Sequence, residues 1–204
     1  MKVIKVICTL FIFGFVSVSH AAVIFITEKD ANAVTSLLGA DNVEVNGLFY
    51  NVRFLDGTCI ELFNGCDNAD DFVFNTSDTA FAAANALLDL VFIDGVDGNF
   101  DTNPELTNGC VGSRACFIDS PGFVPRLKSS RFRFVRIINR DEERRRKVDG
   151  YTTELVEPEL DFRSNGARTY AVWSEAVEAS APGTAMILLM GIAGLLVSQR
   201  RKQA

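Results

Sequence analysis

An apolar run near the C-terminus constrains this chain more than any other feature. Residues 184–198 are mostly apolar, and the basic cluster Arg200, Arg201 and Lys202 follows closely. A helix that spans a bilayer needs about 17 to 25 residues, so the run reaches the lower end of this range when residues 179–183 contribute. A buried core helix is the alternative, but adjacent basic residues at a membrane end are typical of the cytoplasmic side. We therefore expect a transmembrane helix over residues 184–198.

The N-terminus carries the three parts of a secretory signal peptide. Lys2 and Lys5 precede an apolar segment over residues 6–18, and Ser19-His20-Ala21 forms a cleavage site of the small-x-small type. We expect the Sec export machinery to recognise residues 1–21 and the mature chain to begin at about Ala22. The region between the two ends is then an extracellular domain over residues 22–177.

Removal of this signal leaves a chain without histidine, because the single histidine is His20. This excludes Ser-His-Asp and Cys-His catalysis and histidine-ligated zinc. The sequence also has no G-x-S-x-G motif, P-loop or dinucleotide fingerprint. We expect no catalytic role and no cofactor. The alternative is an envelope enzyme that acts on carbohydrate through paired carboxylates.

Charge is distributed unevenly along the mature chain. All 26 acidic residues lie within residues 22–181, together with 15 of the 20 basic residues, which gives this region a net charge of −11. Residues 22–119 contain 16 acidic and 3 basic residues, whereas residues 120–181 contain 10 and 12. An exported, acidic protein of this kind is not expected to bind nucleic acid.

The mature chain retains an even number of cysteines, Cys59, Cys66, Cys110 and Cys116. In an exported protein this pattern indicates two disulfides. Three pairings are open, and the short gaps favour Cys59 with Cys66 and Cys110 with Cys116. A zinc site is the rival interpretation, although the spacing differs from that of the usual zinc-binding cysteine pairs.

Local patterns predict a small α+β domain with antiparallel β-hairpins and one or two packed helices. The clearest signal is Asn46-Gly47 between two apolar runs, which is typical of a type I′ hairpin turn. Strands are expected at residues 22–27, 58–63, 72–74, 131–138, 151–156 and 167–173. Helices are expected over residues 29–38, and over residues 78–92 with Asp78 as the N-cap. Residues 94–119 are expected to form a loop.

Two clusters of charge are candidate binding sites. Asp97, Asn99 and Asp101 stand at alternate positions, as at the start of a calcium loop, but the EF-hand glycine and glutamate are absent. A solvated acidic loop is the simpler interpretation. Residues 126–147 hold ten arginines and lysines, with Arg131 and Arg133 expected to point outward. They would contact an anionic polysaccharide or, as we prefer, compensate the acidic first half of the domain.

The C-terminal segment, residues 178–204, resembles the PEP-CTERM sorting signal of exported proteins in Gram-negative bacteria. The resemblance rests on Pro182, Gly183 and Thr184, the apolar run and the basic cluster; the first Pro-Glu of the namesake motif is replaced by Ser180-Ala181. Residues 43–119 also resemble domains common among such proteins. The resemblance implies recognition by an exosortase-type enzyme that cuts near the proline, although permanent anchoring by the helix stays open.

These features together predict an exported cell-surface or matrix-associated protein. It would be anchored in the inner membrane during transit and then displayed in association with exopolysaccharide. Nothing in residues 22–177 indicates a more specific activity.

Overall fold

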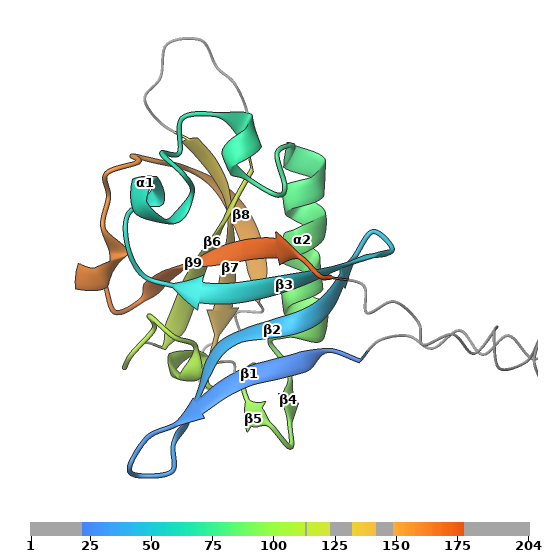
Figure 1. Ribbon diagram of the computed structural model, residues 1–204. Helices are drawn as coiled ribbons and strands as arrows, with labels where there is room; N and C mark the ends of the chain where they lie inside the picture. Colours follow the sequence, from blue (N-terminus) through green and yellow to red (C-terminus); the bar gives the residue numbers. More distant parts are fainter. Residues whose placement is uncertain (1–21, 113, 123–131, 142–148, 178–204) are drawn as a thin grey trace, which may run out of the picture.

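Seven strands form one sheet in the order β1-β2-β3-β9-β6-β7-β8 (Figure 1). This computed structural model describes residues 22–112, 114–122, 132–141 and 149–177. Neighbouring strands run antiparallel, except that β6 and β9 are parallel. The strands are β1 (Ile24–Lys29), β2 (Thr35–Val45), β3 (Leu48–Leu55), β6 (Ala115–Pro121), β7 (Phe132–Arg140), β8 (Gly150–Val156) and β9 (Arg168–Glu175).

A few helical segments accompany the sheet, so the chain is a mixed α+β protein in which strands dominate. The longest is α2 (Ser77–Leu90), which packs against β2, β6 and β7 on one face of the sheet. Shorter elements are α1 (Cys59–Leu62), the 3-10 turns η1 (Ala69–Asp71), η2 (Pro104–Leu106) and η4 (Phe162–Ser164), and a small hairpin of β4 (Asp94–Gly95) and β5 (Gly98–Asn99).

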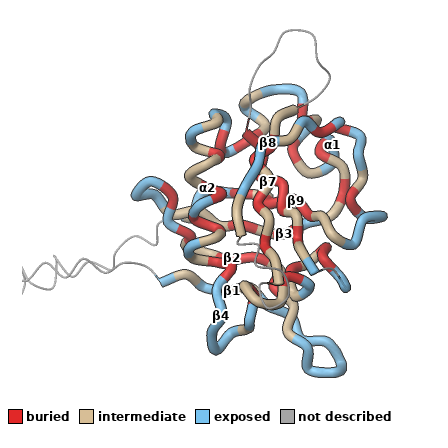
Figure 2. The backbone as a smooth tube through the Cα atoms, turned by 180° about the vertical axis from the view of Figure 1, so that it is seen from behind, coloured by how far each residue is buried: buried red, intermediate tan, exposed pale blue. Residues whose placement is uncertain are grey.

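The larger part of the core lies between α2 and the sheet. Side chains alternate between the two faces of a strand, and Ile118, Val135 and Trp173 point to the α2 side. Three alanines of α2, Ala80, Ala83 and Ala84, are fully buried and let the helix lie close to the strands. Figure 2 shows buried positions along the strands and α2, with exposed positions concentrated in the turns.

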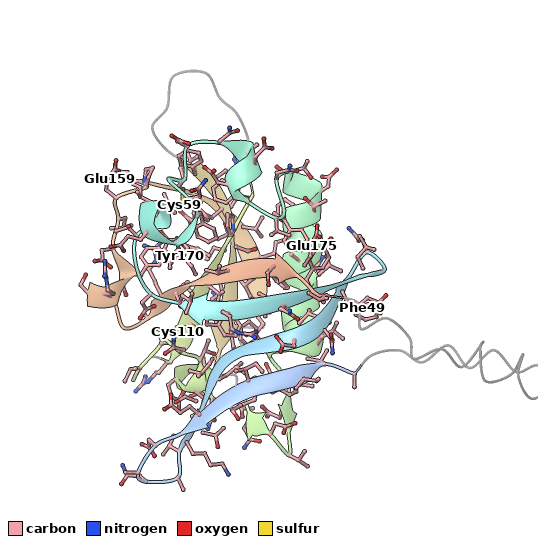
Figure 3. All side chains as sticks on the ribbon, viewed as in Figure 1. Phe49, Cys59, Cys110, Glu159, Tyr170 and Glu175 are labelled. Atoms are coloured by element: carbon pink, nitrogen blue, oxygen red, sulfur yellow. A yellow bond between two sulfur atoms is a disulfide. The ribbon has the colours of Figure 1, made fainter. Side chains whose placement is uncertain are left out.

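A second, smaller cluster covers the opposite face beneath α1. It contains the disulfide-bonded Cys59 and Cys66 together with aromatic side chains, and η4 closes it from the side. Tyr170 of β9 lies at its centre, stacked on Phe162 with ring centroids 4.3 Å apart. Figure 3 labels Cys59 and Tyr170 in this half of the molecule. The opposite face of the sheet is therefore covered at β7 and β9 and at the end of β8.

The hairpin expected at Asn46-Gly47 is confirmed. The two residues connect β2 to β3 and have φ values of 53° and 81°, so both lie in the positive-φ region that a type I′ turn needs. The strands expected at residues 22–27, 131–138, 151–156 and 167–173 are also present, as β1, β7, β8 and β9 with shifted ends.

The helix expected over residues 29–38 was wrong. The Asp30 carboxylate accepts hydrogen bonds from the amides of Asn32 at 2.8 Å and Val34 at 2.9 Å, which closes a turn. The chain then enters β2, where pairing with β1 and β3 supplies the backbone hydrogen bonds that a helix would have made. Gly39 sits within β2, where a Cβ would overlap the carbonyl oxygen of Val52.

The strand expected over residues 58–63 was also wrong, because this segment forms α1. Thr58 and Glu61 make a capping box in which each side chain accepts from the other residue's amide, at 3.2 and 3.1 Å. No strand forms at residues 72–74 either. Phe72 instead packs in the second cluster. Phe74 packs in the larger part of the core, between α2 and the sheet, which we call the α2 cluster.

Two further boundaries differ from expectation. Thr76, not Asp78, is the N-cap of α2, because its hydroxyl accepts from the amide of Thr79. The expected loop over residues 94–119 contains β4, β5 and η2, and its last residues already belong to β6. Strand β6 occupies the interior of the sheet, where pairing with β7 and β9 fixes its conformation.

Both predicted membrane-directed segments lie outside the described residues. These are the signal peptide, residues 1–21, and the sorting segment, residues 178–204, with the helix expected over 184–198. Among the helices that the structure describes, none has the length and apolar character needed to cross a bilayer.

Candidate functional site

All four cysteines of the described residues are paired, and the pairing favoured from sequence is confirmed. Cys59 bonds to Cys66 and Cys110 bonds to Cys116, with Cα–Cα distances of 5.7 and 5.4 Å. Because each sulfur is used in a disulfide, the alternative of a zinc site built from these cysteines is wrong. Disulfides that persist in a folded domain are typical of an oxidising compartment outside the cytoplasm.

The acidic loop that was a candidate for calcium binding is held by hydrogen bonds among its own residues. The Asp94 carboxylate accepts from the amides of Asp101 and Thr102 and from the Thr102 hydroxyl, at 3.0 to 3.1 Å. Asp97 and Asn99 are exposed. Within residues 22–112, 114–122, 132–141 and 149–177, no three His, Cys, Asp or Glu side chains gather as metal ligands.

The basic stretch is only partly within the described residues. Arg131 lies outside them, as do the other arginines and lysines of the stretch that precede Arg133 or follow Arg140. Arg133 is half-buried with a buried Nε atom rather than directed outward, because α2 covers this face of β7. Arg136 lies on the opposite face, beside Phe134.

Asp119 of β6 organises the polar centre of that face. Its side chain is fully buried, and both oxygens accept from Arg136: Nε to Oδ1 at 2.7 Å and Nη2 to Oδ2 at 2.9 Å. Arg168 of β9 donates from Nη2 to Oδ2 at 3.0 Å. One carboxylate therefore holds two guanidinium groups, whose side chains are 12% and 19% exposed.

Strand pairing explains why these three residues meet. Asp119 stands opposite Arg136 in the antiparallel β6–β7 register, and Arg168 stands opposite Phe117 in the parallel β6–β9 register, two residues away on the same face. Burial alone would lower the pKa of Arg136, but its hydrogen bond to Asp119 and the charges of Asp119 and Glu154 outweigh this and raise the pKa. Arg136 is therefore a permanent cation.

Tyr170 completes this polar centre. It is fully buried, and its hydroxyl has no hydrogen-bond partner among the described residues. Burial raises the pKa of Tyr170, and the negative charge of Asp119 raises it further, while Arg168 and Arg136 oppose the shift. The phenol stays neutral at physiological pH, so it contributes an unused O–H group and no charge.

A pocket of about 260 Å³ opens above the two arginines. Glu154 at its rim is 43% exposed and lies 3.5 Å from Nη1 of Arg136, a looser contact than that with Asp119. The Arg168 guanidinium is fixed over the Phe162 ring, 4.3 Å from its centroid. The lining residues are Arg136, Glu154, Leu155, Val156, Glu157, Leu160 and Arg168. We call this the arginine pocket.

A second pocket of similar volume lies at the end of the interior strands where β3 begins and β9 ends. It is lined by Leu48, Phe49, Tyr50, Glu175 and Ala176. The Ala176 amide donates to the Phe49 carbonyl at 3.0 Å, which holds the end of β9 against β3. Figure 3 labels Phe49 and Glu175 near the point where the chain continues into its C-terminal segment. The pocket carries a single charged side chain and presents no evident chemistry.

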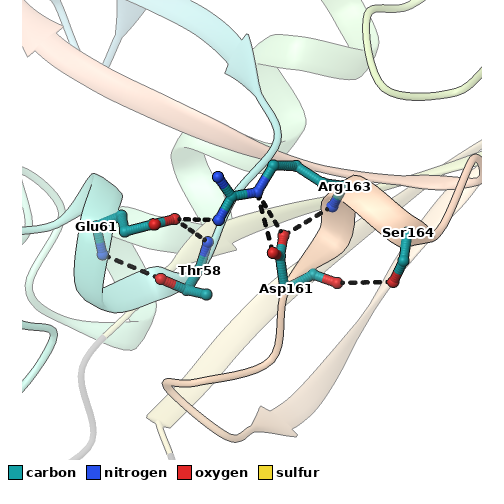
Figure 4. Close-up of polar contacts among 5 residues, drawn as sticks. All are labelled: Thr58, Glu61, Asp161, Arg163 and Ser164. Atoms are coloured by element: carbon teal, nitrogen blue, oxygen red, sulfur yellow. Dashed lines mark hydrogen bonds and ion pairs between the residues drawn. The ribbon is translucent and has the colours of Figure 1, made fainter.

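An ionic network on the surface links η4 to α1 (Figure 4). Arg163 donates from Nη2 to Glu61 at 2.7 Å and from Nε to both oxygens of Asp161 at 3.0 Å. Hydrogen bonds from Arg163 lower the pKa of Asp161, and hydrogen bonds from Thr58 and Arg163 lower that of Glu61. All three charged side chains are exposed. The network holds two segments of the second cluster together and is not enclosed enough to form a binding site.

Sequence reasoning included Arg136 only as one of the ten basic residues within residues 126–147, and it singled out no other member of the arginine pocket. A signal for Arg136 was present, because the alternation that predicts β7 places it on the face of Phe132 and Phe134. A charged residue on a buried face requires a partner. That partner, Asp119, could not be identified without the sheet register. No protein-family model, curated protein or solved structure matches this chain.

Proposed function

We propose that this chain is an exported protein that is displayed at the cell surface or in the extracellular matrix, where it binds and does not catalyse. The observation that carries the proposal is the pair of disulfides within the described domain. Each closes a short loop, and Cys59 and Cys66 lie in a different core cluster from Cys110 and Cys116. The fold thus depends at two places on an oxidising environment.

The positions of the first and last strands support tethering at one side of the domain. Strand β1 begins at Ile24, which pairs with Asp41 of β2, and β9 ends at Glu175, which pairs with Tyr50 of β3. Since adjacent strands lie about 4.8 Å apart, the two ends are on the order of 15 Å from each other. Figure 1 shows both at the same edge of the sheet. A domain of this shape suits export with both ends directed at one membrane.

The proposed route uses the segments outside the described residues. The Sec machinery exports the chain through the signal at residues 1–21, and the helix over residues 184–198 anchors it in the inner membrane during transit. An exosortase-type enzyme then recognises Pro182, Gly183 and Thr184 together with the basic cluster, and cuts near the proline.

Mass spectrometry of the mature protein tests this route. The full-length chain would be expressed in a host that contains an exosortase and recovered from the cell surface. We expect an N-terminus at about Ala22 and a C-terminus near Pro182. Recovery of surface protein that retains residues 184–204 would contradict sorting and favour permanent anchoring. Recovery of an uncleaved N-terminus in the cytoplasm would contradict export.

We further propose that the displayed domain associates with exopolysaccharide, because the arginine pocket offers cations, carboxylates and apolar side chains at a solvent-accessible site. A carbohydrate-active enzyme is the second candidate, favoured by Glu154 and Glu157 lining the same pocket. A screen against polymeric carbohydrates separates the two candidates. Binding without turnover supports the first, whereas released sugar supports the second.

A further inference from the structure

We propose that the arginine pocket binds the carboxylate of a sugar acid, a uronate residue, through Arg168 and Arg136. This inference deepens the proposed association with exopolysaccharide by naming the acidic class of saccharide. It rests on the geometry of three side chains, Asp119, Arg136 and Arg168, and on the pocket that opens above them.

The charge count at the floor of the pocket favours an anion. Two guanidinium groups are held by the single buried carboxylate of Asp119, which leaves one positive charge at the floor. Glu154 and Glu157 line the pocket as well, but Glu154 is 43% exposed and Glu157 is exposed, so water screens their charges. The two arginines are mostly buried and are screened far less. An incoming carboxylate therefore meets its strongest interaction at the floor.

The arginines also have hydrogen-bond donors to spare. A guanidinium carries five N–H donors. Asp119 takes two from Arg136 and one from Arg168. Among the described residues, Nη1 of Arg136 has only the loose contact with Glu154, whereas the unpartnered Nε of Arg168 is buried and out of reach of a ligand. A carboxylate is the acceptor that matches a guanidinium in geometry and charge.

The site is formed before a ligand arrives. Arg168 is fixed by its hydrogen bond to Asp119 and by stacking on Phe162, and Arg136 is fixed by two hydrogen bonds to the same carboxylate. Because these side chains are already ordered, binding requires little further loss of conformational entropy.

The size and the rim favour a sugar ring over other carboxylates. A volume of about 260 Å³ is slightly below the roughly 300 to 1,000 Å³ of pockets for drug-sized ligands, which suits a single ring. Glutamates at the rim can accept from ring hydroxyls, while Val156 and Leu160 can pack against its C–H face. An amino acid would place its ammonium group against screened carboxylates, where it gains little.

The acidic character of the whole domain gives this site a distinctive salt dependence. The region of residues 22–181 has a net charge of −11 and repels a polyanion at long range. Salt screens that repulsion more effectively than it screens contacts with mostly buried arginines. Affinity for a uronate polymer should therefore hold or rise between low and moderate ionic strength, the reverse of binding to an exposed basic patch.

Isothermal titration calorimetry of the full-length chain tests the inference. Glucuronate is the probe, with glucose as the neutral match, acetate as the bare carboxylate and alanine as the zwitterion. We expect glucuronate to bind at least ten-fold more tightly than each of the others. Equal binding of glucose, tighter binding of alanine, or no heat with glucuronate would each overturn the proposal.

Three variants locate the binding. Arg168→Gln should weaken glucuronate binding by at least ten-fold. Leu160→Trp should do the same by filling the pocket without altering the ion network, so a folding defect in the first variant does not leave the question open. Arg114→Gln, which removes an exposed arginine outside the pocket, should bind as the wild type does. Unchanged affinity in the first two variants, or lost affinity in the third, would contradict the assignment.

The outcomes also separate this inference from the function on which it rests. Polysaccharide that is retained equally by wild type, Arg168→Gln and Leu160→Trp would overturn the uronate site while leaving the proposed association intact. Glucuronate that binds in the pocket of a protein which retains no polysaccharide would support the site and overturn the association.

Discussion

Asp119 and Arg136 are joined across adjacent strands by two parallel hydrogen bonds of 2.7 and 2.9 Å, in the interior of a seven-stranded sheet. Arg168 is held by the same carboxylate from the other side. A buried carboxylate of this kind is costly to desolvate and is tolerated only when its partners are in place. The network therefore links stability of the sheet to the chemistry of the pocket above it.

Asp119→Asn should destabilise the protein by about 3 kcal/mol, the lower end of the range for removing one partner of a buried ion pair. The lower end applies because Arg136 and Arg168 keep some contact with water. Urea unfolding followed by the fluorescence of Trp173 measures the change. Asp97→Asn, at an exposed position, is the control and should change stability by less than about 0.5 kcal/mol. Equal effects of the two substitutions would show that the network contributes nothing specific.

Asp56→Asn should stabilise the protein at neutral pH. Burial raises the pKa of the Asp56 carboxyl, the neighbouring Thr169 side chain opposes the shift, and the charge of Asp161 adds to it. The folded state therefore disfavours the ionised form, and wild-type stability falls as pH rises from the unfolded pKa through the raised folded pKa. The asparagine variant removes this loss.

The pH profile provides the check for Asp56. Thermal unfolding of the two proteins from pH 3 to pH 8 should give similar melting temperatures at the acid end, where the carboxyl is protonated in both states. The variant should gain its advantage as the carboxyl ionises. A constant difference across the range would mean that packing, and not ionisation, separates the two proteins.

The fold could be predicted from sequence where a feature depends on a few adjacent residues, and not where it depends on pairing with distant ones. Asn46-Gly47 specifies its turn through the φ values of two adjacent residues, and the sequence predicted that hairpin correctly. Residues 29–38 show helical spacing, yet strand pairing with distant residues overrides it. At residues 58–63 the capping box of Thr58 and Glu61 was visible in the sequence, but the apolar residues between suggested a strand.

The arginine pocket illustrates the limit more clearly. Asp119 and Arg168 are separated by 49 residues and meet through the parallel pairing of β6 with β9. No local pattern encodes that pairing, because parallel neighbours are joined by long connections. The even number of cysteines and their short gaps, in contrast, favoured the pairing that the structure shows.

Gly109→Ala should destabilise the protein more than Gly47→Ala. Both glycines have positive φ, at 86° and 81°, so both substitutions carry a backbone strain of roughly 1 to 2 kcal/mol. At Gly109 a Cβ would also overlap Asp56 Oδ1 and crowd the Thr169 side chain, whereas nothing lies near a Cβ at Gly47. Melting temperatures of the two variants measure the difference. A larger loss of stability for Gly47→Ala would contradict the close packing of Gly109 against Asp56 and Thr169.

Removal of either disulfide should cost about 2.5 kcal/mol, the chain-entropy estimate for loops closed by cysteines six or seven positions apart. The two losses should add, because Cys59 and Cys66 lie in the second cluster while Cys110 and Cys116 lie in the α2 cluster. Urea unfolding of the two double alanine variants and the quadruple variant measures each loss. A loss in the quadruple variant no larger than the greater loss in the two double variants would show that the bridges are coupled.

A combined loss of about 5 kcal/mol would consume the whole stability of a protein at the lower end of the usual range of 5 to 15 kcal/mol. The same chain made without residues 1–21 in a reducing cytoplasm should then be partly unfolded, and the oxidised form should be the protease-resistant one.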